Sequence, residues 1–157
     1  MVDVVLVPGG WSGGWAFASI ARELRARGHE VFTPTLTGLG ERSHLMCAHP
    51  NLDTHIDDVA NVLLFERLSG VILCAHSYAG MVISGVADRL PERIAALVYA
   101  DAFVPEDGQS WWDLAGDYSA NSPLTAREWT ASASRPWNIW TRGAHPIRSQ
   151  RSARPFG

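Results

Sequence analysis

The segment Ala75-His76-Ser77-Tyr78-Ala79-Gly80 has the composition and the setting of a turn that presents a nucleophilic serine. The apolar run before it predicts a buried strand, and apolar residues three and four positions apart after it predict a helix. A serine at such a junction occupies a very tight turn, and small flanking residues, here Ala75 and Ala79, let the chain fold back. Glycine is usual at both flanks, so two alanines are a departure at a strained turn. The alternative is an ordinary serine N-cap.

Two backbone N–H groups are candidates to stabilise negative charge on a substrate oxygen. A helix that begins just after Ser77 directs its free N–H groups toward the serine, which makes the N–H of Tyr78 one donor. The second donor is expected from the glycine-rich loop 8–14, where Gly10 is the candidate. A phosphate-binding loop is the rival interpretation, but the sequence has neither Gly-Lys-Ser/Thr nor the full G-x-G-x-x-G pattern with its later acidic residue. Trp11 of this loop lines an apolar pocket or packs in the core.

A serine nucleophile also needs a proton acceptor and an acidic partner. Asp101 ends the fourth predicted strand at the same sheet edge as Ser77 and is the candidate acid; a carboxylate that fixes the next loop is the alternative. His145 is the sole histidine after the turn and is the candidate base, although it lies in an irregular segment. The side chain of His76 is predicted to point away from that of Ser77. Three further histidines are expected to face solvent or to anchor loops: His44, His49 and His55.

Strand and helix patterns alternate along the first two thirds of the chain. Apolar runs predict strands at 4–7, 30–33, 71–75 and 95–100, with helical periodicity around 17–24, 54–64 and 79–86. This alternation predicts βαβ units in a parallel sheet with helices on both faces, so the fold class is α/β. We predict a polar loop at 34–51, then a helix whose start at Thr54 and Asp57 resembles a capping box.

Composition limits the classes of function. The chain has 157 residues, which suits one domain, and a net charge of −3 gives no reason to expect a nucleic-acid partner. Cys47 and Cys74 show no metal-ligand spacing, so no metal site is predicted. The apolar run at the N-terminus is too short for a signal peptide or a membrane span, so no membrane partner is expected and a cytoplasmic location is the prediction.

Beyond residue 105 the pattern weakens. All 16 acidic residues lie at or before Glu128, whereas five of the 13 basic residues follow it. We therefore predict three parts: an α/β core at 1–105, the start of a cap region at 106–130, and an irregular tail at 131–157 that is disordered or non-native.

Residues 4–112 resemble the α/β-hydrolase family, in the branch of small esterases and hydroxynitrile lyases related to plant methylesterases. The matching segments are Leu6-Val7-Pro8-Gly9-Gly10-Trp11-Ser12-Gly13-Gly14-Trp15, Leu36-Thr37-Gly38-Leu39-Gly40, His76-Ser77-Tyr78-Ala79-Gly80-Met81 and Tyr99-Ala100-Asp101-Ala102-Phe103-Val104-Pro105. The resemblance implies a three-layer αβα fold and hydrolysis of small-molecule carboxylic esters through an acyl-enzyme at Ser77, with no cofactor. Family members usually carry histidine at the position of Pro8, a change that leaves the backbone donor at Gly10 intact.

The resemblance also sets out the alternatives. In the family the acid and then the histidine follow the nucleophile along the chain, on segments for which this sequence shows no counterpart, so a catalytically incomplete, C-terminally truncated hydrolase is the second hypothesis. A hydroxynitrile lyase is the third; Gly9, where such lyases carry a hydroxyl residue, and the absence of lysine favour the esterase. Without further strands the fourth strand would leave an exposed sheet edge, where a homo-oligomer is expected to form.

Overall fold

The computed structural model describes residues 1–115 of the 157-residue chain. Four strands, β1 (Asp3–Val7), β2 (Glu30–Phe32), β3 (Val71–Ser77) and β4 (Ile94–Ala102), alternate with the helices α1 (Ala18–Ala26), α2 (Leu52–Phe65) and α3 (Ala79–Arg89), and a short α4 (Trp111–Ala115) follows. Three 3-10 helices lie at Gly14–Phe17, Gly40–Ala48 and Pro91–Arg93. All four predicted strands and three predicted helices are present, with boundaries that differ by one or a few residues.

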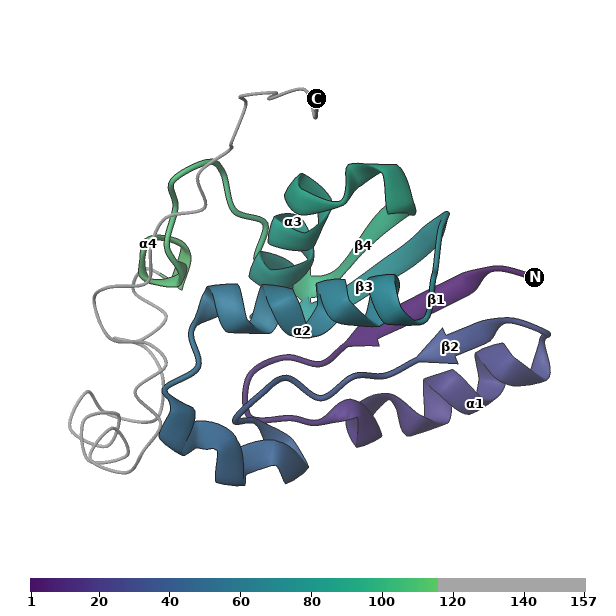
Figure 1. Cartoon of the computed structure of the whole chain (residues 1–157), viewed down its shortest axis with the longest axis horizontal. Helices are drawn as coiled ribbons and strands as arrows, with labels where there is room; N and C mark the ends of the chain where they lie inside the picture. Colours follow the sequence, from purple (N-terminus) through teal and green to yellow (C-terminus); the bar gives the residue numbers. More distant parts are fainter. Residues whose placement is uncertain (116–157) are drawn as a thin grey trace.

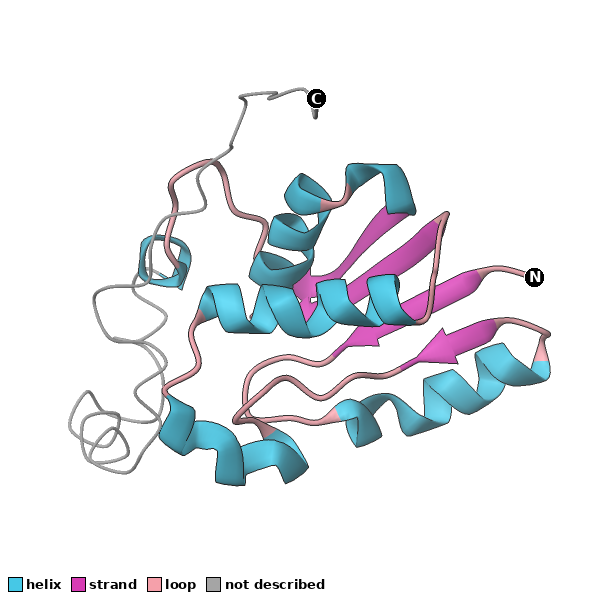
Figure 2. Ribbon diagram, in the orientation of Figure 1, coloured by secondary structure: helices cyan, strands magenta, loops and turns pink. Residues whose placement is uncertain are grey.

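The strands form a parallel sheet in the order β2-β1-β3-β4. Val5 of β1 pairs with Phe32 of β2 on one side and with Leu73 of β3 on the other. All three strand pairings are parallel, so the carboxyl ends of the strands lie at one edge of the sheet, and Figure 2 shows β1 and β2 pointing the same way. In open α/β sheets ligands bind outside that edge, which is where each strand hands the chain to a loop or helix. The predicted α/β parallel-sheet fold is confirmed.

Helices cover the two faces of the sheet in separate layers, α1 on one side and α2 with α3 on the other (Figure 1). Successive residues of β1 point to opposite faces, as a strand requires. Val5 and Val7 therefore join the larger core under α2 and α3, while Val4 and Leu6 join the smaller core under α1. Packing of the sheet between α1 on one face and α2 with α3 on the other holds the carboxyl edge of the sheet in a fixed position.

Two local predictions were wrong in detail. The segment 34–51 is not simply a loop, because Gly40–Ala48 forms a 3-10 helix. Helix α2 begins earlier than predicted: Asn51 is the N-cap and its side chain accepts a hydrogen bond from the N–H of Thr54, so Thr54 is the third helical residue of the capping box rather than its first member. Asn is as good an N-cap as Ser or Asp, so position 51 can start the helix as well as Thr54 could.

The outer strand β4 is covered on one face only. Its residues alternate between partly buried positions on the α3 side and exposed positions, and Val98 is 43% exposed. Among the described strands β4 also has a free hydrogen-bonding edge, as predicted, whereas the oligomer expected there stays a prediction. No helix within residues 1–115 has the length and apolarity to cross a membrane. The predicted tail, 131–157, and most of the predicted cap region lie outside the described residues.

Candidate active site at the carboxyl edge of the sheet

Ser77 occupies the junction between β3 and α3 in a backbone conformation that serine rarely adopts. Its φ is +53°, in the left-handed region, while Tyr78 directly after it is already helical with φ −49° and ψ −35°. A non-glycine residue pays about 1–2 kcal/mol for this conformation. The predicted tight bend is thus present, and Ser77 remains partly exposed at the edge of the sheet while Ala75 and Ala79 on either side are fully buried. The N-cap alternative was wrong, because Tyr78 and not Ser77 is the N-cap of α3; the role of Ser77 as a nucleophile stays a prediction.

The end of β4 fixes this turn from one side. The N–H of Phe103 donates a hydrogen bond of 3.1 Å to the carbonyl oxygen of Ser77. Gly80 lets α3 approach closely, because a Cβ added at Gly80 would overlap the carbonyl oxygen of Phe103. The strained turn is therefore held by backbone contacts that leave no room for a larger residue at position 80.

The glycine loop after β1 lies directly against Ser77. A Cβ added at Gly9 would stand 3.0 Å from the Cβ of Ser77 and 3.0 Å from the carbonyl oxygen of His76. The backbone of Gly9 therefore passes Ser77 at a distance that leaves little room for a side chain at position 9. Gly10, whose N–H is the predicted second donor, directly follows this contact, and its role stays a prediction.

The segment 35–41 packs against the glycine loop. The N–H of Gly14 donates to the hydroxyl oxygen of Thr35 over 2.7 Å, and that hydroxyl in turn donates to the carboxylate of Glu41. The Thr35 hydrogen bond, with the Glu41 N–H as a further donor, lowers the pKa of Glu41. Gly40 packs on the backbone of Gly13, since a Cβ there would lie 2.8 Å from the nitrogen of Gly13. Residues 35–41 thus fix the position of the glycine loop.

Backbone strain gathers at this edge of the sheet. Five described residues other than glycine have a positive φ, and three of them follow or end neighbouring strands: Trp11 after β1 (φ +70°), Ser77 at the end of β3 and Asp101 near the end of β4 (φ +47°). Such strain costs about 1–3 kcal/mol per residue and concentrates at functional sites. Its clustering around Ser77 supports this edge as the functional site. Trp11 is 46% exposed, which counts against the core-packing alternative, and its pocket-lining role stays a prediction.

Asp101 lies beside Ser77 through an irregularity in the sheet. His76 pairs with Ala100 but Ser77 pairs with Ala102, so Asp101 is the extra residue of a β-bulge. A bulge redirects a side chain, and that of Asp101 is exposed and makes no hydrogen bond or ion pair with the rest of residues 1–115. The alternative role of fixing the next loop has no such contact to support it. Asp101 remains a candidate acid.

The structure does not bring a proton acceptor to Ser77 within the described residues. His145, the predicted base, lies outside them. His76 is exposed, and its Nδ1 lies beside the glycine loop, 3.1 Å from a Cβ added at Gly9. Within residues 1–115 the hydroxyl of Ser77 forms no hydrogen bond, and no group of three or more His, Cys, Asp or Glu residues suits a metal ion.

Sequence reasoning missed a buried pair next to the nucleophile. His55 on α2 is fully buried, and its Nδ1 lies 2.9 Å from the hydroxyl oxygen of Tyr78, whereas its Nε2 lies 2.8 Å from the carbonyl oxygen of Thr37. Burial lowers the pKa of His55 and raises that of Tyr78, so both side chains stay neutral near pH 7. His55 does anchor a loop, one of the two predicted roles. The available signal was its spacing of four from Val59 and eight from Leu63, on the buried stripe of α2.

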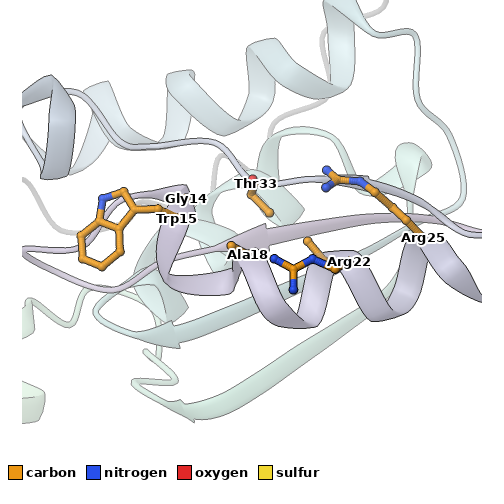
Figure 3. A pocket seen from close by; sticks show the side chains of 7 residues that line it. Gly14, Trp15, Ala18, Arg22, Arg25 and Thr33 are labelled. Carbon is orange, nitrogen blue, oxygen red and sulfur yellow. The ribbon is translucent and has the colours of Figure 1, made fainter.

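A surface cavity of about 370 Å³ lies away from Ser77, along α1. Figure 3 shows Trp15 at one end of it and Arg25 at the other. Its lining residues are Gly14, Trp15, Ala18, Ala21, Arg22, Arg25 and Thr33. They include none of the predicted site residues, and the Arg25 guanidinium already donates to the carbonyl oxygen of Val31. We therefore do not place the reaction in this cavity.

Comparison with known proteins points to one family. Residues 4–156 match the model of the Alpha/beta hydrolase family. The chain is 54% identical over 110 residues to a carbendazim hydrolyzing esterase of Nocardioides sp. (strain SG-4G), which covers 70% of this chain and 46% of that protein. It is 32% identical over 111 residues to a pyrethroid hydrolase of Sphingobium wenxiniae, covering 69% of this chain and 38% of that protein.

A solved alpha/beta-hydrolase structure also superposes on this chain. An extracellular alpha/beta-hydrolase from a Paenibacillus species superposes with a TM-score of 0.65 at 34% identity, over 70% of this chain and 44% of that one. The chain therefore spans less than half the length of these relatives.

Proposed function

This chain belongs to the alpha/beta hydrolase family, and on that premise we propose that it is a serine hydrolase acting on small-molecule carboxylic esters. The observation that carries the proposal is Ser77 at φ +53°, at the carboxyl edge of the sheet with the backbone of Gly9 against it. The names of two relatives, an esterase and a hydrolase, support ester hydrolysis as the reaction class.

In the proposed reaction the oxygen of Ser77 attacks the ester carbonyl carbon, and the hydroxyl proton passes to a base. The tetrahedral oxyanion accepts hydrogen bonds from the N–H groups of Tyr78 and Gly10, each worth a factor of about 10²–10³ in rate for such sites. Collapse of this intermediate breaks the bond to the alcohol, which leaves with a proton, and an acyl group remains on Ser77. Water then cleaves the acyl-enzyme and restores the serine.

The acid and the base are the parts that need testing. Asp101 is the described carboxylate at the same edge as Ser77, and His145 is the histidine after the turn. If neither completes the machinery, the oxyanion donors alone still accelerate attack on an activated ester, by about 10³–10⁴ over water in a well-studied serine protease. Acylation would then outrun deacylation, and the acyl-enzyme would accumulate. Accumulation of the acyl-enzyme is thus the measurable sign of the catalytically incomplete alternative.

The test is release of p-nitrophenol from p-nitrophenyl acetate by the 157-residue chain, with Ser77→Ala as the matched control. We expect release that depends on Ser77, as a burst of one equivalent for the incomplete enzyme or as continuing turnover for the complete one. If turnover continues, Asp101→Asn and His145→Ala identify the group responsible. Release that is equal in Ser77→Ala and the unaltered chain would overturn the proposal.

Carbendazim is the first specific substrate to try, because the relative with 54% identity is named for its hydrolysis. A chromatographic assay for loss of carbendazim, again with Ser77→Ala as control, tests whether this chain shares that substrate. Gly9→Ala is a further variant for the same assay, because the added Cβ would lie 3.0 Å from the Cβ of Ser77.

A further inference from the structure

The buried pair His55 and Tyr78 joins the nucleophile turn to the loop that supports the glycine loop. His55 is on α2, Tyr78 follows Ser77 directly, and Thr37 lies in the segment before the 3-10 helix Gly40–Ala48. The imidazole bonds to both partners, and its ring meets the Tyr78 ring edge-on with centroids 5.7 Å apart. Neither side chain takes part directly in the proposed reaction at Ser77.

The hydrogen bonds determine which nitrogen of His55 carries the proton. The carbonyl oxygen of Thr37 can only accept, so Nε2 must be the protonated nitrogen. In a neutral imidazole Nδ1 is then an acceptor, and the Tyr78 hydroxyl must donate to it. The chain of donors therefore has one direction: from the Tyr78 O–H to His55 Nδ1, and from His55 Nε2–H to the Thr37 carbonyl.

Each end of this chain leads toward one of the two proposed oxyanion donors. At one end, the Tyr78 side chain is buried in the core, and the backbone N–H of the same residue is one of the proposed donors. At the other end, Thr37 is fixed twice by Asp58, through its N–H at 2.6 Å and its hydroxyl at 2.8 Å. The loop that contains Thr37 continues to Gly40, which packs on Gly13 of the glycine loop.

We propose that His55 is a positioning residue of the Ser77 site, which as its Nε2–H tautomer holds the Tyr78 N–H and the glycine loop at a fixed separation. The catalytic part of this statement rests on the proposed esterase function. Catalysis by two backbone donors depends on their spacing, because displacing a group in an active site by about 1 Å can cost a factor of about 10² in rate.

Two conservative substitutions separate the two hydrogen bonds of His55. In His55→Asn the side-chain oxygen stands near the place of Nδ1 and still accepts from Tyr78, but the side chain is too short to reach Thr37. In His55→Gln the amide nitrogen stands near the place of Nε2 and donates to Thr37, but the acceptor that Nδ1 offers to the Tyr78 hydroxyl is lost. Tyr78→Phe removes the same Tyr78 hydrogen bond from the other side, with little change in shape.

The first readout is the rate of Ser77 acylation by p-nitrophenyl acetate as a function of ester concentration. We expect His55→Gln and Tyr78→Phe each to lower the maximal rate by about 10–100-fold with little change in the half-saturating concentration, and His55→Asn to recover most of it. The double variant His55→Gln/Tyr78→Phe should be no slower than either single variant, because both remove one interaction. Leu63→Ala, a buried change two turns further along α2, is the control for lost stability.

The second readout is independent of catalysis. Nitrogen-15 NMR of the His55 ring should show Nε2 protonated and Nδ1 unprotonated, and His55→Gln should move the signals of the Ser77 and Tyr78 amides. If the ring carries its proton on Nδ1, or if those amides do not respond, the positioning role is refuted whether or not the chain acylates. If the amides respond but Leu63→Ala slows acylation as much as His55→Gln, the catalytic role is refuted. Failure of Ser77 to acylate at all refutes the esterase function alone, and the NMR result then decides the positioning role.

Discussion

Replacing Ser77 by glycine should make the protein more stable than replacing it by alanine. Alanine keeps the Cβ that makes a φ of +53° unfavourable, and glycine removes it. Relief of the left-handed conformation is worth about 1–2 kcal/mol, and the extra freedom of glycine in the unfolded chain costs roughly 0.5–1 kcal/mol. The difference of the midpoints leaves Ser77→Gly more stable than Ser77→Ala by about 0.7 kcal/mol. Both variants lose the hydroxyl, so its contribution cancels.

The assay is thermal and urea unfolding of the two variants, followed by circular dichroism. For a domain of this size about 0.7 kcal/mol corresponds to roughly 3 °C in Tm. The matched control is the pair Ser84→Gly and Ser84→Ala, because Ser84 lies inside α3, where glycine is about 1 kcal/mol worse than alanine. The order of stability should therefore reverse between the two positions.

If Ser77→Gly is as unstable relative to Ser77→Ala as Ser84→Gly is relative to Ser84→Ala, then Ser77 does not adopt a left-handed conformation. The reasoning from a strained nucleophile turn would then be wrong. If Ser77→Gly is more stable than Ser77→Ala and neither variant is acylated, the turn stores strain at the residue whose hydroxyl the reaction needs.

Three further predictions test other parts of the account. Gly80→Ala should destabilise by about 1–3 kcal/mol, because its Cβ would overlap the Phe103 backbone; Gly85→Ala, which meets the movable end of a side chain, should cost less in the same unfolding assay. The free energy of unfolding should fall as pH drops below about 6.5. Burial lowers the pKa of His55 in the folded protein, an effect that Asp58 opposes and Arg42 reinforces, so below this pH the unfolded chain binds more protons than the folded one. Urea titrations at about pH 5–8 should show this dependence, and His55→Asn should flatten it. Val98→Arg, on the exposed face of β4, should shift a dimer to monomer in light scattering; a monomeric unaltered chain would refute the oligomer.

The strands and the Ser77 turn were predictable because their signals are local. A run such as Val71-Ile72-Leu73 indicates a buried strand wherever it occurs, and a serine between small residues at its end indicates the bend. The start of α2 was predicted three residues late because Thr54 and Asp57 imitate a capping box, while Asn51, the true cap, has no distinguishing neighbour. Local patterns therefore give the elements but not always their ends.

The features that depend on distant residues were not predictable. The contact of His55 with Tyr78 joins residues 23 apart in the sequence, and a histidine on an apolar stripe does not reveal its partner. The bulge at Asp101 depends on the pairing of β4 with β3, which no pattern in β4 alone encodes. The close approach of Gly9 to Ser77 follows from the parallel pairing of β1 with β3. The sequence therefore predicts the glycine loop but not the distance between Gly9 and Ser77.

The most direct test of the central claim is to identify the residue that becomes acylated. The 157-residue chain is incubated with p-nitrophenyl acetate, quenched in acid and analysed by peptide mass spectrometry, beside Ser77→Ala. We predict one acetyl group on the peptide that contains Ser77 and none on the corresponding peptide of the variant. Acetylation confined to other residues, or an unmodified Ser77 while ester is hydrolysed at the same rate by both proteins, would contradict the account.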